Sequence, residues 1–578
     1  MRGYFSLETA KVEMGVAEAV RGCVETRSQA YQAVHPSARL RVLSSQPETI
    51  WGKFDHLLYL PLLNLSRPRD LYYYQGDGLQ SLYGFTYKYH PLEQFLGQLT
   101  RLELGQPLAN RLARSYTQAW YSQDETLFVF ADWHVKPHWT KWFSHSGAVT
   151  MWGRVMPGTK QLLVDGPEGH LLIGWNYPID SHFSRVLVEM EAQLATIVER
   201  PIAYTIVDSE GSGLSLAERY AEAKRDYLSV LPRNPIRPLS DFKVQGPWQT
   251  VTDDPEHEVV AAIWADDKKA EQDPRHLILM RPVGHPDPTR IYTGCIPADI
   301  PLTQIPSLFR QRWFHQEWRI RELVKGANLN VNYGYTYDEV PNRTRHREWQ
   351  EVQEKVEVTE AKLVQHTEAL TNLRLQLPQL RQTYRQQKAD LLAELQIHQQ
   401  DLVQRQQTGQ PIVRCQQGLA RREQQLNKLT TRYQKRRQTL LNRLSQHRQQ
   451  GRQLQTKLVE QQATRDAIDT DTLCRERLLE KDQIMLNLQL LLINLHDWAS
   501  EHYFAPQWQQ LQLKTATQLI YQKPGRIRWY PDRIEVELEP YRYADQQRAM
   551  EATCDRFNAA NLRWRDGRLL CIHVARET

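Results

Sequence analysis

The feature that most constrains the fold is a heptad repeat within residues 346–470. Leucine or tyrosine recurs at every seventh position on both sides of a Gly409–Pro411 break, at Leu363, Leu370, Leu377, Tyr384 and Leu391 and then at Leu419, Leu426, Tyr433, Leu440 and Leu454, with His447 filling the one gap. Apolar residues at this spacing form a seam that is buried only when a second helix packs against it. Two such arms around a Gly/Pro turn predict an antiparallel coiled-coil hairpin.

Positive charge is concentrated on the second arm of this predicted hairpin. Twelve basic residues lie between Arg414 and Lys457, against a single acid, Glu423. Such a surface is typical either of a solvated helix or of a helix that contacts the phosphates of DNA. The candidate DNA-binding residues on this arm are Arg432, Lys435, Arg436 and Arg437.

Two short apolar runs each end in an aspartate. Residues 127–131, rich in aromatic and β-branched side chains, precede Asp132, and residues 202–207 precede Asp208. Both runs predict buried strands. A carboxylate in such a place is costly unless it caps a turn, is paired or binds a metal. The two aspartates are therefore candidates for a shared site.

A third acid lies on a predicted helix. Residues 308–323 contain no Gly or Pro and have helical apolar spacing, and they carry Glu317 among Arg310, Arg312, Arg319 and Arg321. Two Mg²⁺ ions about 4 Å apart need shared carboxylates on rigid elements. Strand-Asp, strand-Asp and helix-Glu in this order is therefore the layout of a two-metal phosphoryl-transfer site.

Further residues around the three acids form recognisable motifs. They are Asp132, His134, Lys136 and Pro137 in the first; Asp208, Glu210 and Gly211 in the second; and Arg312, Trp313, Gln316 and Glu317 in the third. In these motifs the chain resembles the DDE transposases of prokaryotic insertion sequences, whose long members carry D-G-H-x-K-P, D-x-E-G and R-W-x-Q-E-N-F-F. The resemblance extends over roughly residues 50–575.

The chain also departs from the family's motifs. Trp133 stands where the family has Gly, and Trp318 where it has Asn. The spacing from the Arg-Trp pair to the glutamate is one residue longer than in the family. This longer spacing leaves Glu322 as an alternative third carboxylate.

The resemblance implies an α/β fold with an RNase H-like core and roles for several residues. Asp132, Asp208 and Glu317 would hold two Mg²⁺ ions, for which Mn²⁺ would substitute. His134 and Lys136 would contact the scissile phosphate. The arginines that surround Glu317 would contact DNA phosphates or balance the charge of the acids, and they are Arg312, Arg319 and Arg321.

The function implied by the resemblance is transposition. The protein would bind the ends of an insertion sequence, cleave them and join the 3′ ends to target DNA. Its partners would be double-stranded DNA, from the element ends and the target, and a second copy of the chain in a homodimer on DNA. Two alternatives remain open, a metal-dependent DNA nuclease without strand transfer and a catalytically inactive DNA-binding or structural protein.

The chain of 578 residues is long enough for several domains, and we expect a multidomain α/β protein. The expected parts are a helical N-terminal region with possible DNA-end binding (1–125), the first part of the core (126–234), a separable β-rich insertion (235–305), the second part of the core with the catalytic helix (306–345), the coiled-coil hairpin (346–470), and a C-terminal helix with a small α+β unit (471–578).

Composition limits the cellular setting. The formal net charge of +6 is compatible with nucleic-acid binding, and the six cysteines form no C-x-x-C pair, which argues against zinc knuckles and a disulfide framework. The N-terminus lacks the apolar stretch of a signal peptide, and no run of 18 apolar residues occurs. We expect a cytoplasmic, nucleoid-associated protein without a membrane segment.

Overall fold

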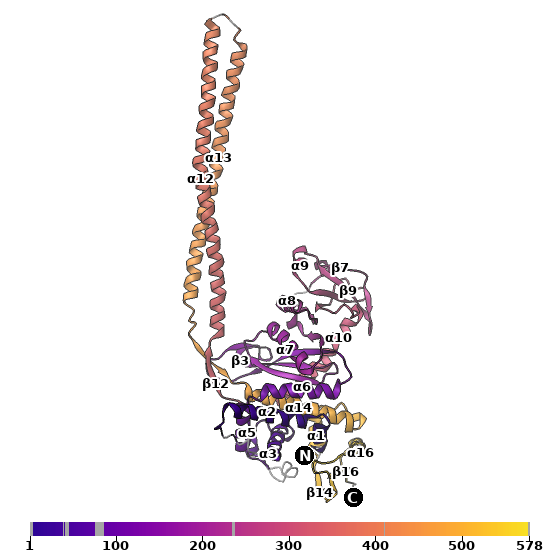
Figure 1. Cartoon of the computed structure of the whole chain (residues 1–578). Helices are drawn as coiled ribbons and strands as arrows, with labels where there is room; N and C mark the ends of the chain where they lie inside the picture. The colour runs from indigo at the N-terminus through magenta and orange to yellow at the C-terminus, as the bar shows by residue number, and fades with distance from the viewer. Residues whose placement is uncertain are drawn as a thin grey trace. The chain divides into compact units, whose positions relative to one another are not determined.

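The structure is a computed structural model that describes residues 4–38, 40, 46–74, 86–233, 237–407, 409 and 411–575. The chain divides into two compact units. The first consists of Met1–Glu339 and Arg475–Thr578, and the second of Val340–Cys474. The first unit is a mixed α/β assembly built on one large sheet (Figure 1).

The large sheet has 11 strands in the order β2-β3-β1-β5-β6-β11-β10-β9-β7, with β4 paired to β3 and β8 to β9. β3 is antiparallel to β1 and β4, whereas β5 is parallel to both β1 and β6. The strands are β1 (Leu127–Pro137), β2 (Ser146–Val149), β3 (Arg154–Asp165), β4 (Leu171–Pro178), β5 (Ile202–Val207), β6 (Tyr227–Val230), β7 (Phe242–Val244), β8 (Gln249–Val251), β9 (Asp254–Trp264), β10 (His276–Pro282) and β11 (Arg290–Cys295).

The parallel strands are linked by helical crossovers. Helix α7 (Phe183–Val198) connects β4 to β5, and α8 (Leu214–Ala223) connects β5 to β6. The first apolar run forms the start of β1, where Val129, Phe130 and Ala131 are fully buried. Strand β1 then continues through Pro137, beyond the predicted run, because β3 pairs with it along this whole length.

The strands expected to form a separable insertion instead extend the large sheet. β11 pairs with β6, and β10, β9 and β7 follow in order. Phe130 and Ile206 of β1 and β5 pack in one hydrophobic cluster with Val259 and Tyr292 of β9 and β11. The expectation of separability is wrong, because removing these strands would expose both that shared cluster and an edge of β6.

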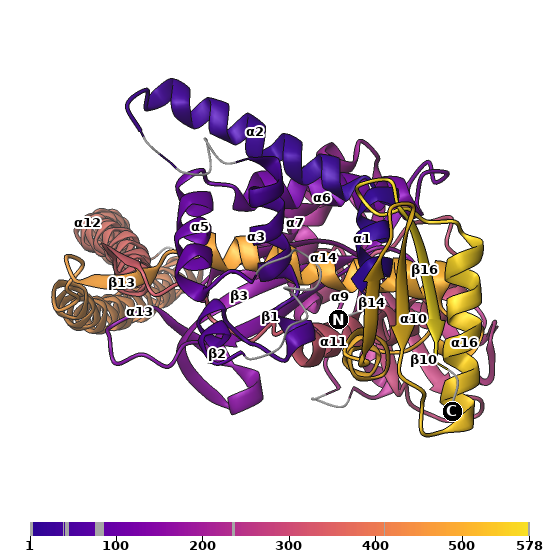
Figure 2. The same cartoon turned by 90° about the horizontal axis from the view of Figure 1, so that it is seen from below.

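The described part of the N-terminal region is helical, as its sequence predicts. It contains α1 (Tyr4–Glu13), α2 (Val16–Val34), α3 (Pro47–Leu58), η2 (Pro61–Leu63), η3 (Pro68–Tyr72), α5 (Tyr89–Arg101) and α6 (Gly105–Trp120). Of these, α1, α3, α5 and α6 pack on one long helix, α14 (Glu480–Tyr503), and α2 packs on α1 and α6, so the region does not form a separate body. In Figures 1 and 2, α14 runs between the large sheet and helices α1, α3 and α5.

Helix α14 is buried on nearly all sides, including its polar residues. Their amide groups donate to backbone carbonyls: Gln483 to Gly174, Asn487 to Gly105, Gln489 to Asn328 and Asn494 to Leu171, at 2.7 to 2.9 Å. A polar group without a partner is costly in such a place, so these bonds fix the helix's rotation and register. No helix among the described residues is long and apolar enough to cross a membrane.

The C-terminal residues add a small sheet to the same core. β14 (Gly525–Trp529), β15 (Arg533–Leu538) and β16 (Leu569–Val574) form it, and α16 (Ala544–Ala559) packs against it. Val536 and Phe557 belong to the same hydrophobic cluster as the leucines of α14.

The shorter elements of the chain are η4 (Thr150–Trp152), η5 (Ser209–Ser212), η6 (Leu239–Asp241), α9 (Asp267–Gln272), η7 (Leu302–Gln304), η9 (Pro506–Trp508), α15 (Leu513–Ala516) and η10 (Thr517–Tyr521).

The second unit contains two long helices, α12 (Arg343–Gln407) and α13 (Val413–Asp466), where the heptads predict the two arms. Tyr384 stacks on Tyr433 with ring centroids 4.1 Å apart, and Nδ1 of His366 lies 3.1 Å from Nδ1 of His447. These pairings, early residue to late residue, require the helices to be antiparallel. α12 runs through Pro378 as one helix, and β12 (Tyr337–Pro341) pairs with β13 (Leu473–Arg477).

Shortening a buried leucine of α14 should destabilise the first unit strongly. Leu492 is fully buried, so Leu492→Ala should lower the free energy of unfolding by about 2–5 kcal/mol. Leu214, with an exposed fraction of 44%, provides the matched control, and Leu214→Ala should change it by less than about 1 kcal/mol. Urea titrations followed by tryptophan fluorescence measure both, and equal effects would contradict the central place of α14.

Candidate active site

The two motif aspartates lie on neighbouring parallel strands. Ala131 of β1 is in register with Val207 of β5, so Asp132 and Asp208 follow at adjacent positions. Parallel strands place equivalent positions side by side, and this pairing brings the two carboxylates to one region of the sheet. Asp132 and Asp208 therefore lie close together because the two strands that precede them are neighbours in the sheet.

Glu317 reaches the same region through a π-helical turn. This turn, η8 (Trp313–Glu317), lies between α10 (Ile305–Arg312) and α11 (Trp318–Gly326). Residues five apart on an α-helix point about 140° away from each other, at about 100° per residue. A π-turn bonds residue i to i+5 and brings such residues onto one face. The extra residue between Arg312 and Glu317 is accommodated in this way.

One guanidinium group joins the two carboxylates that come from different parts of the chain. Arg312 Nη1 donates to Asp132 Oδ2 at 3.0 Å, and Arg312 Nη2 donates to Glu317 Oε1 at 2.7 Å. The pKa of Asp132 is raised to about 7, chiefly by burial; Asp208 and Glu317 also raise it, whereas Arg312 opposes the shift. Asp208 and Glu317 raise the pKa of Asp132 because three negative charges lie close together, and the positive charge of Arg312 partly neutralises them.

Asp208 has a local role in shaping its turn. Its carboxylate accepts a hydrogen bond from the Glu210 amide at 2.8 Å, and the Ser229 hydroxyl donates to its carbonyl. Burial raises the pKa of Glu210, Asp208 raises it further, and Lys160 opposes both. Glu210 belongs to the second motif, where the sequence indicates no role for it. In the structure it is a fourth carboxylate in this region.

His134 and Lys136 lie on the same face of β1 as Asp132 but are covered by other residues. His134 Nε2 lies 2.6 Å from Asn330 Oδ1, and burial lowers its pKa. Lys136 Nζ donates to Asp482 at 2.8 Å, and its side chain is 2% exposed. Both side chains therefore have partners inside the protein, from the segment around Asn330 and from α14, and their contact with the scissile phosphate stays a prediction.

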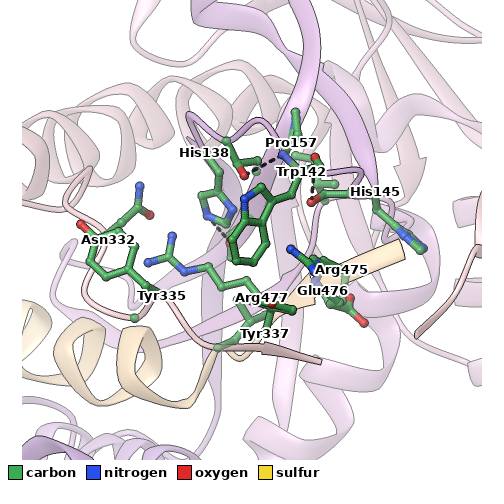
Figure 3. Close-up of a pocket in the computed structure, with 18 of the residues that line it drawn as sticks. His138, Trp142, His145, Pro157, Asn332, Tyr335, Tyr337, Arg475, Glu476 and Arg477 are labelled. Atoms are coloured by element: carbon green, nitrogen blue, oxygen red, sulfur yellow. Dashed lines mark hydrogen bonds between the residues drawn. The ribbon is translucent and has the colours of Figure 1, made fainter. Parts of the chain in front are cut away.

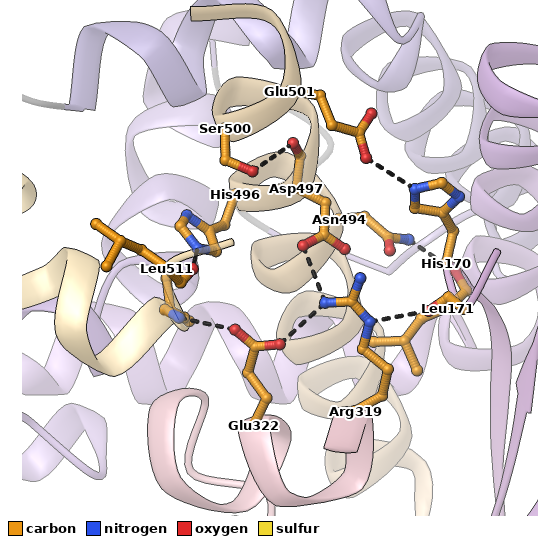
Figure 4. A network of polar contacts seen from close by, with 12 residues as sticks. His170, Leu171, Arg319, Glu322, Asn494, His496, Asp497, Ser500, Glu501 and Leu511 are labelled. Carbon is orange, nitrogen blue, oxygen red and sulfur yellow. Dashed lines mark hydrogen bonds and ion pairs between the residues drawn. The ribbon is translucent and has the colours of Figure 1, made fainter. Parts of the chain in front are cut away.

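Arg319 and Glu322 also belong to the interior. Figure 4 shows Arg319 between Glu322 and Asp497, with its Nη1 at 2.9 and 3.0 Å from them, while its Nε donates to the Gly169 carbonyl. Glu322 accepts a second bond from the Leu513 amide at 2.7 Å. Arg319 therefore balances buried acids instead of contacting DNA, and Glu322 is not the third carboxylate beside Asp132.

The remaining predicted DNA-binding residues are accessible. Arg321 is exposed, and its guanidinium lies 5.3 Å from the centre of the Trp313 ring. On α13, four side chains are exposed and carry the basic surface that the sequence indicates: Arg432, Lys435, Arg436 and Arg437.

A buried aspartate under the site escaped sequence reasoning. Asp165 of β3 pairs with Phe130 of β1 and is fully buried, and neither carboxylate oxygen has a hydrogen-bond partner in the described ranges. Burial raises its pKa well above the usual value; Arg319 opposes this, whereas Asp132 and Asp497 add to it. The only sequence signal is an acid at the end of a long apolar strand, the same signal that Asp132 gives.

The donor set at the site is compatible with a hard divalent cation. Within the part of the chain that the structure describes, no three His, Cys, Asp or Glu side chains are arranged to hold a metal ion as they stand. Asp132 and Glu317 share Arg312 instead. Carboxylate oxygens suit Mg²⁺, and the repulsion that raises the pKa of Asp132 is one that a cation relieves.

Comparison with known proteins gives little beyond this geometry. No protein-family model matches the chain, and no curated protein matches it. Among solved structures, a piggyBac transposase in a synaptic complex with hairpin DNA is similar over 56% of this chain and 68% of that one. The sequence identity is 9% and the TM-score 0.31, a likeness too small to bear on function.

The buried Asp165 makes stability depend on pH. Its folded-state pKa is raised, so the folded chain retains a proton that the unfolded chain loses above about pH 3.8. Stability should therefore fall as the pH rises from there towards neutrality, and Asp165→Asn should reduce this slope. Urea midpoints at a series of pH values measure it, with Asp124→Asn on the surface as control. An unchanged slope in Asp165→Asn would show that Asp165 is not the group responsible.

Proposed function

We propose that the chain is a DNA transposase of the DDE type with an RNase H-like core. The observation that carries the proposal is the meeting of three acids from distant parts of the chain. Asp132 and Asp208 follow paired positions of parallel strands, and one guanidinium spans Asp132 and Glu317. The pKa of Asp132 is raised, chiefly by burial, and perturbed pKa values are concentrated at functional sites.

The strand order supports the proposed core. β1, β3 and β4 form an antiparallel meander, and β5 and β6 follow in parallel to β1 with helical crossovers. This is the arrangement expected of an RNase H-like core, in which Asp132 lies on β1 and Asp208 directly follows the adjacent β5. Strands β7 to β11 then extend the sheet before the chain returns with Glu317.

In the proposed site, Asp132, Asp208 and Glu317 hold Mg²⁺, with Mn²⁺ as a substitute. The ions would activate the attacking oxygen and steady the leaving oxygen at phosphorus. The role of Arg312 is to hold Asp132 and Glu317 together and to neutralise them until an ion replaces it. The reaction consists of cleavage at the element ends and joining of the 3′ ends to target DNA.

Double-stranded DNA is the proposed partner, bound by a homodimer. Arg321 beside the site and the basic residues of α13 provide exposed positive charge for the phosphates. The alternatives, a nuclease without strand transfer and an inactive DNA-binding protein, differ in products. Incubation with flanking DNA and Mg²⁺ separates the three: a transposase yields joined products, a nuclease yields only cut DNA, and an inactive DNA-binding protein yields no reaction.

Removing one charge from the site should abolish cleavage without loss of DNA binding. Asp132→Asn and Glu317→Gln keep the side-chain size but remove a negatively charged ligand. Cleavage is measured on labelled end DNA with Mg²⁺, and binding by gel shift. Asp241→Asn, an exposed acid on the same unit, is the control and should retain activity. Full cleavage by Asp132→Asn would overturn the proposed role of these acids.

Replacing Arg312 should make stability depend on divalent ions. In Arg312→Gln two facing carboxylates lose their shared cation, so stability without metal should fall by on the order of 3 kcal/mol. Mg²⁺ should then raise the melting temperature of this variant more than that of the wild type, because ion and guanidinium compete. Arg310→Gln, whose arginine pairs with Asp253 and Asp254 elsewhere, is the control. An Mg²⁺ response no larger than in the wild type would contradict ion binding between Asp132 and Glu317.

The basic face of α13 should contribute affinity without sequence preference. Replacing Arg432, Lys435, Arg436 and Arg437 with Gln keeps helix propensity and removes four charges. Binding should weaken equally for all DNA sequences, and the salt dependence should decrease by up to about 0.9 per lost phosphate contact. Fluorescence anisotropy at several salt concentrations measures both quantities. Unchanged values would indicate a solvated surface, and sedimentation would then test α12 and α13 for a role in dimerisation.

A further inference from the structure

A second candidate site lies in a pocket that the proposed chemistry does not use. It encloses about 260 Å³ and is formed by five segments of the first unit (Figure 3). These are the loop after β1 (138–145), the β3 residues 157–159, residues 178–179 at the end of β4, the stretch 332–337 and residues 475–479. The pocket lies at the Pro137 end of β1, where Gly158 of β3 pairs with Pro137.

The walls of the pocket are aromatic rings combined with arginines. Trp142 and Tyr337 meet edge to face with centroids 4.2 Å apart, and the Arg475 guanidinium lies 4.1 Å from the centre of the Trp142 ring and 4.4 Å from that of Tyr337. The exposed fraction is 44% for Trp142 and 71% for Tyr335. Large exposed rings at a cavity are available for stacking against a planar ligand.

Two buried polar atoms of residues that line the pocket make no hydrogen bond. They are Arg477 Nη2 and Asn332 Oδ1, which have no partner among the residues that the structure describes, although Arg477 Nε forms an ion pair with Asp482 at 3.5 Å. His138 is neutral, because burial and the charges of Arg477 and Lys136 lower its pKa to about 3, and it shares a hydrogen bond with Thr159. Buried polar groups without partners are unusual in folded proteins and indicate a missing bonding partner.

We propose that this pocket binds a single unstacked nucleobase of DNA. A base presents a planar face to the rings of Trp142 and Tyr335 and acceptors at its edge to the guanidinium of Arg477. A purely apolar ligand would leave Arg477 Nη2 without a hydrogen bond, and a simple anion would not use the rings. Arg475 adds positive charge for the neighbouring phosphate.

The position of the pocket defines which base it can take. Asp132 and His138 are six residues apart along one extended segment, which corresponds to roughly 20 Å at about 3.3 Å per residue. The bound base is therefore not the reacting nucleotide but one several positions away on the same strand. This assignment rests on the proposed function, because it assumes that DNA reaches the site at Asp132.

The test uses a duplex with a short single-stranded overhang that carries 2-aminopurine, whose fluorescence reports stacking. The wild-type protein should bind this DNA more tightly than a blunt duplex and should change its fluorescence. Trp142→Ala should weaken overhang binding roughly 5- to 150-fold and abolish the fluorescence change, with blunt-duplex binding unchanged. Trp142→Phe should retain part of the effect because a ring remains.

The matched control is Trp529→Ala. Trp529 is 43% exposed and has the Arg568 guanidinium 4.6 Å from its ring centre, which reproduces the surroundings of Trp142 outside the pocket. This variant should bind both DNAs as the wild type does. An equal loss of overhang binding in Trp142→Ala and Trp529→Ala would overturn the inference. The inference would also be overturned if the wild-type protein bound the overhang no more tightly than an overhang with an abasic site in place of the base. Intact cleavage without any fluorescence change would refute the pocket alone, whereas no binding to any DNA would refute the proposed function as well.

Discussion

The first unit depends on the hydrogen bonds that anchor the buried helix α14. Its amide side chains donate to the carbonyls of Gly174, Gly105, Asn328 and Leu171, which come from β4, α6 and the segment after α11. An apolar helix could rotate or slide in its groove at little cost, whereas each of these bonds must be broken before α14 can move. The sheet, the N-terminal helices and the return of the chain after Glu317 are therefore held in one register.

The same helix decides which motif residues remain available for chemistry. Its Asp482 binds Lys136 and its Asp497 binds Arg319, so two basic side chains of the resembled motifs support the interior. The acids in turn gain partners that make their burial possible. What is left beside the sheet is the group of Asp132, Asp208 and Glu317, with Arg312 as the cation between two of them. A phosphate would therefore meet Arg321 in preference to Arg319 or Lys136, since Arg321 is exposed.

The π-turn Trp313–Glu317 links local sequence to this geometry. One additional residue in a regular α-helix would rotate Glu317 away from Arg312, and the widened turn restores the meeting of their side chains. The cost of an irregular helix is offset by the ion pairs that it makes possible. Arg312 then acts as an internal counter-ion between Asp132 and Glu317.

The sequence by itself determined the elements with strong periodicity or composition: the two arms of the hairpin, the strands before Asp132 and Asp208, and the C-terminal helix with its small α+β unit. These depend on local spacing and turn chemistry, which one sequence contains in full. Only the tertiary structure decided that the strands of 235–305 continue the large sheet, that Lys136 and Arg319 face buried acids, and that Asp165 lies unpaired beneath the site. These outcomes depend on which segment covers a given face, and α14 lies more than 150 residues along the chain from every strand of that sheet. A contact at that separation is set by the packing of the whole chain, and no local pattern records it.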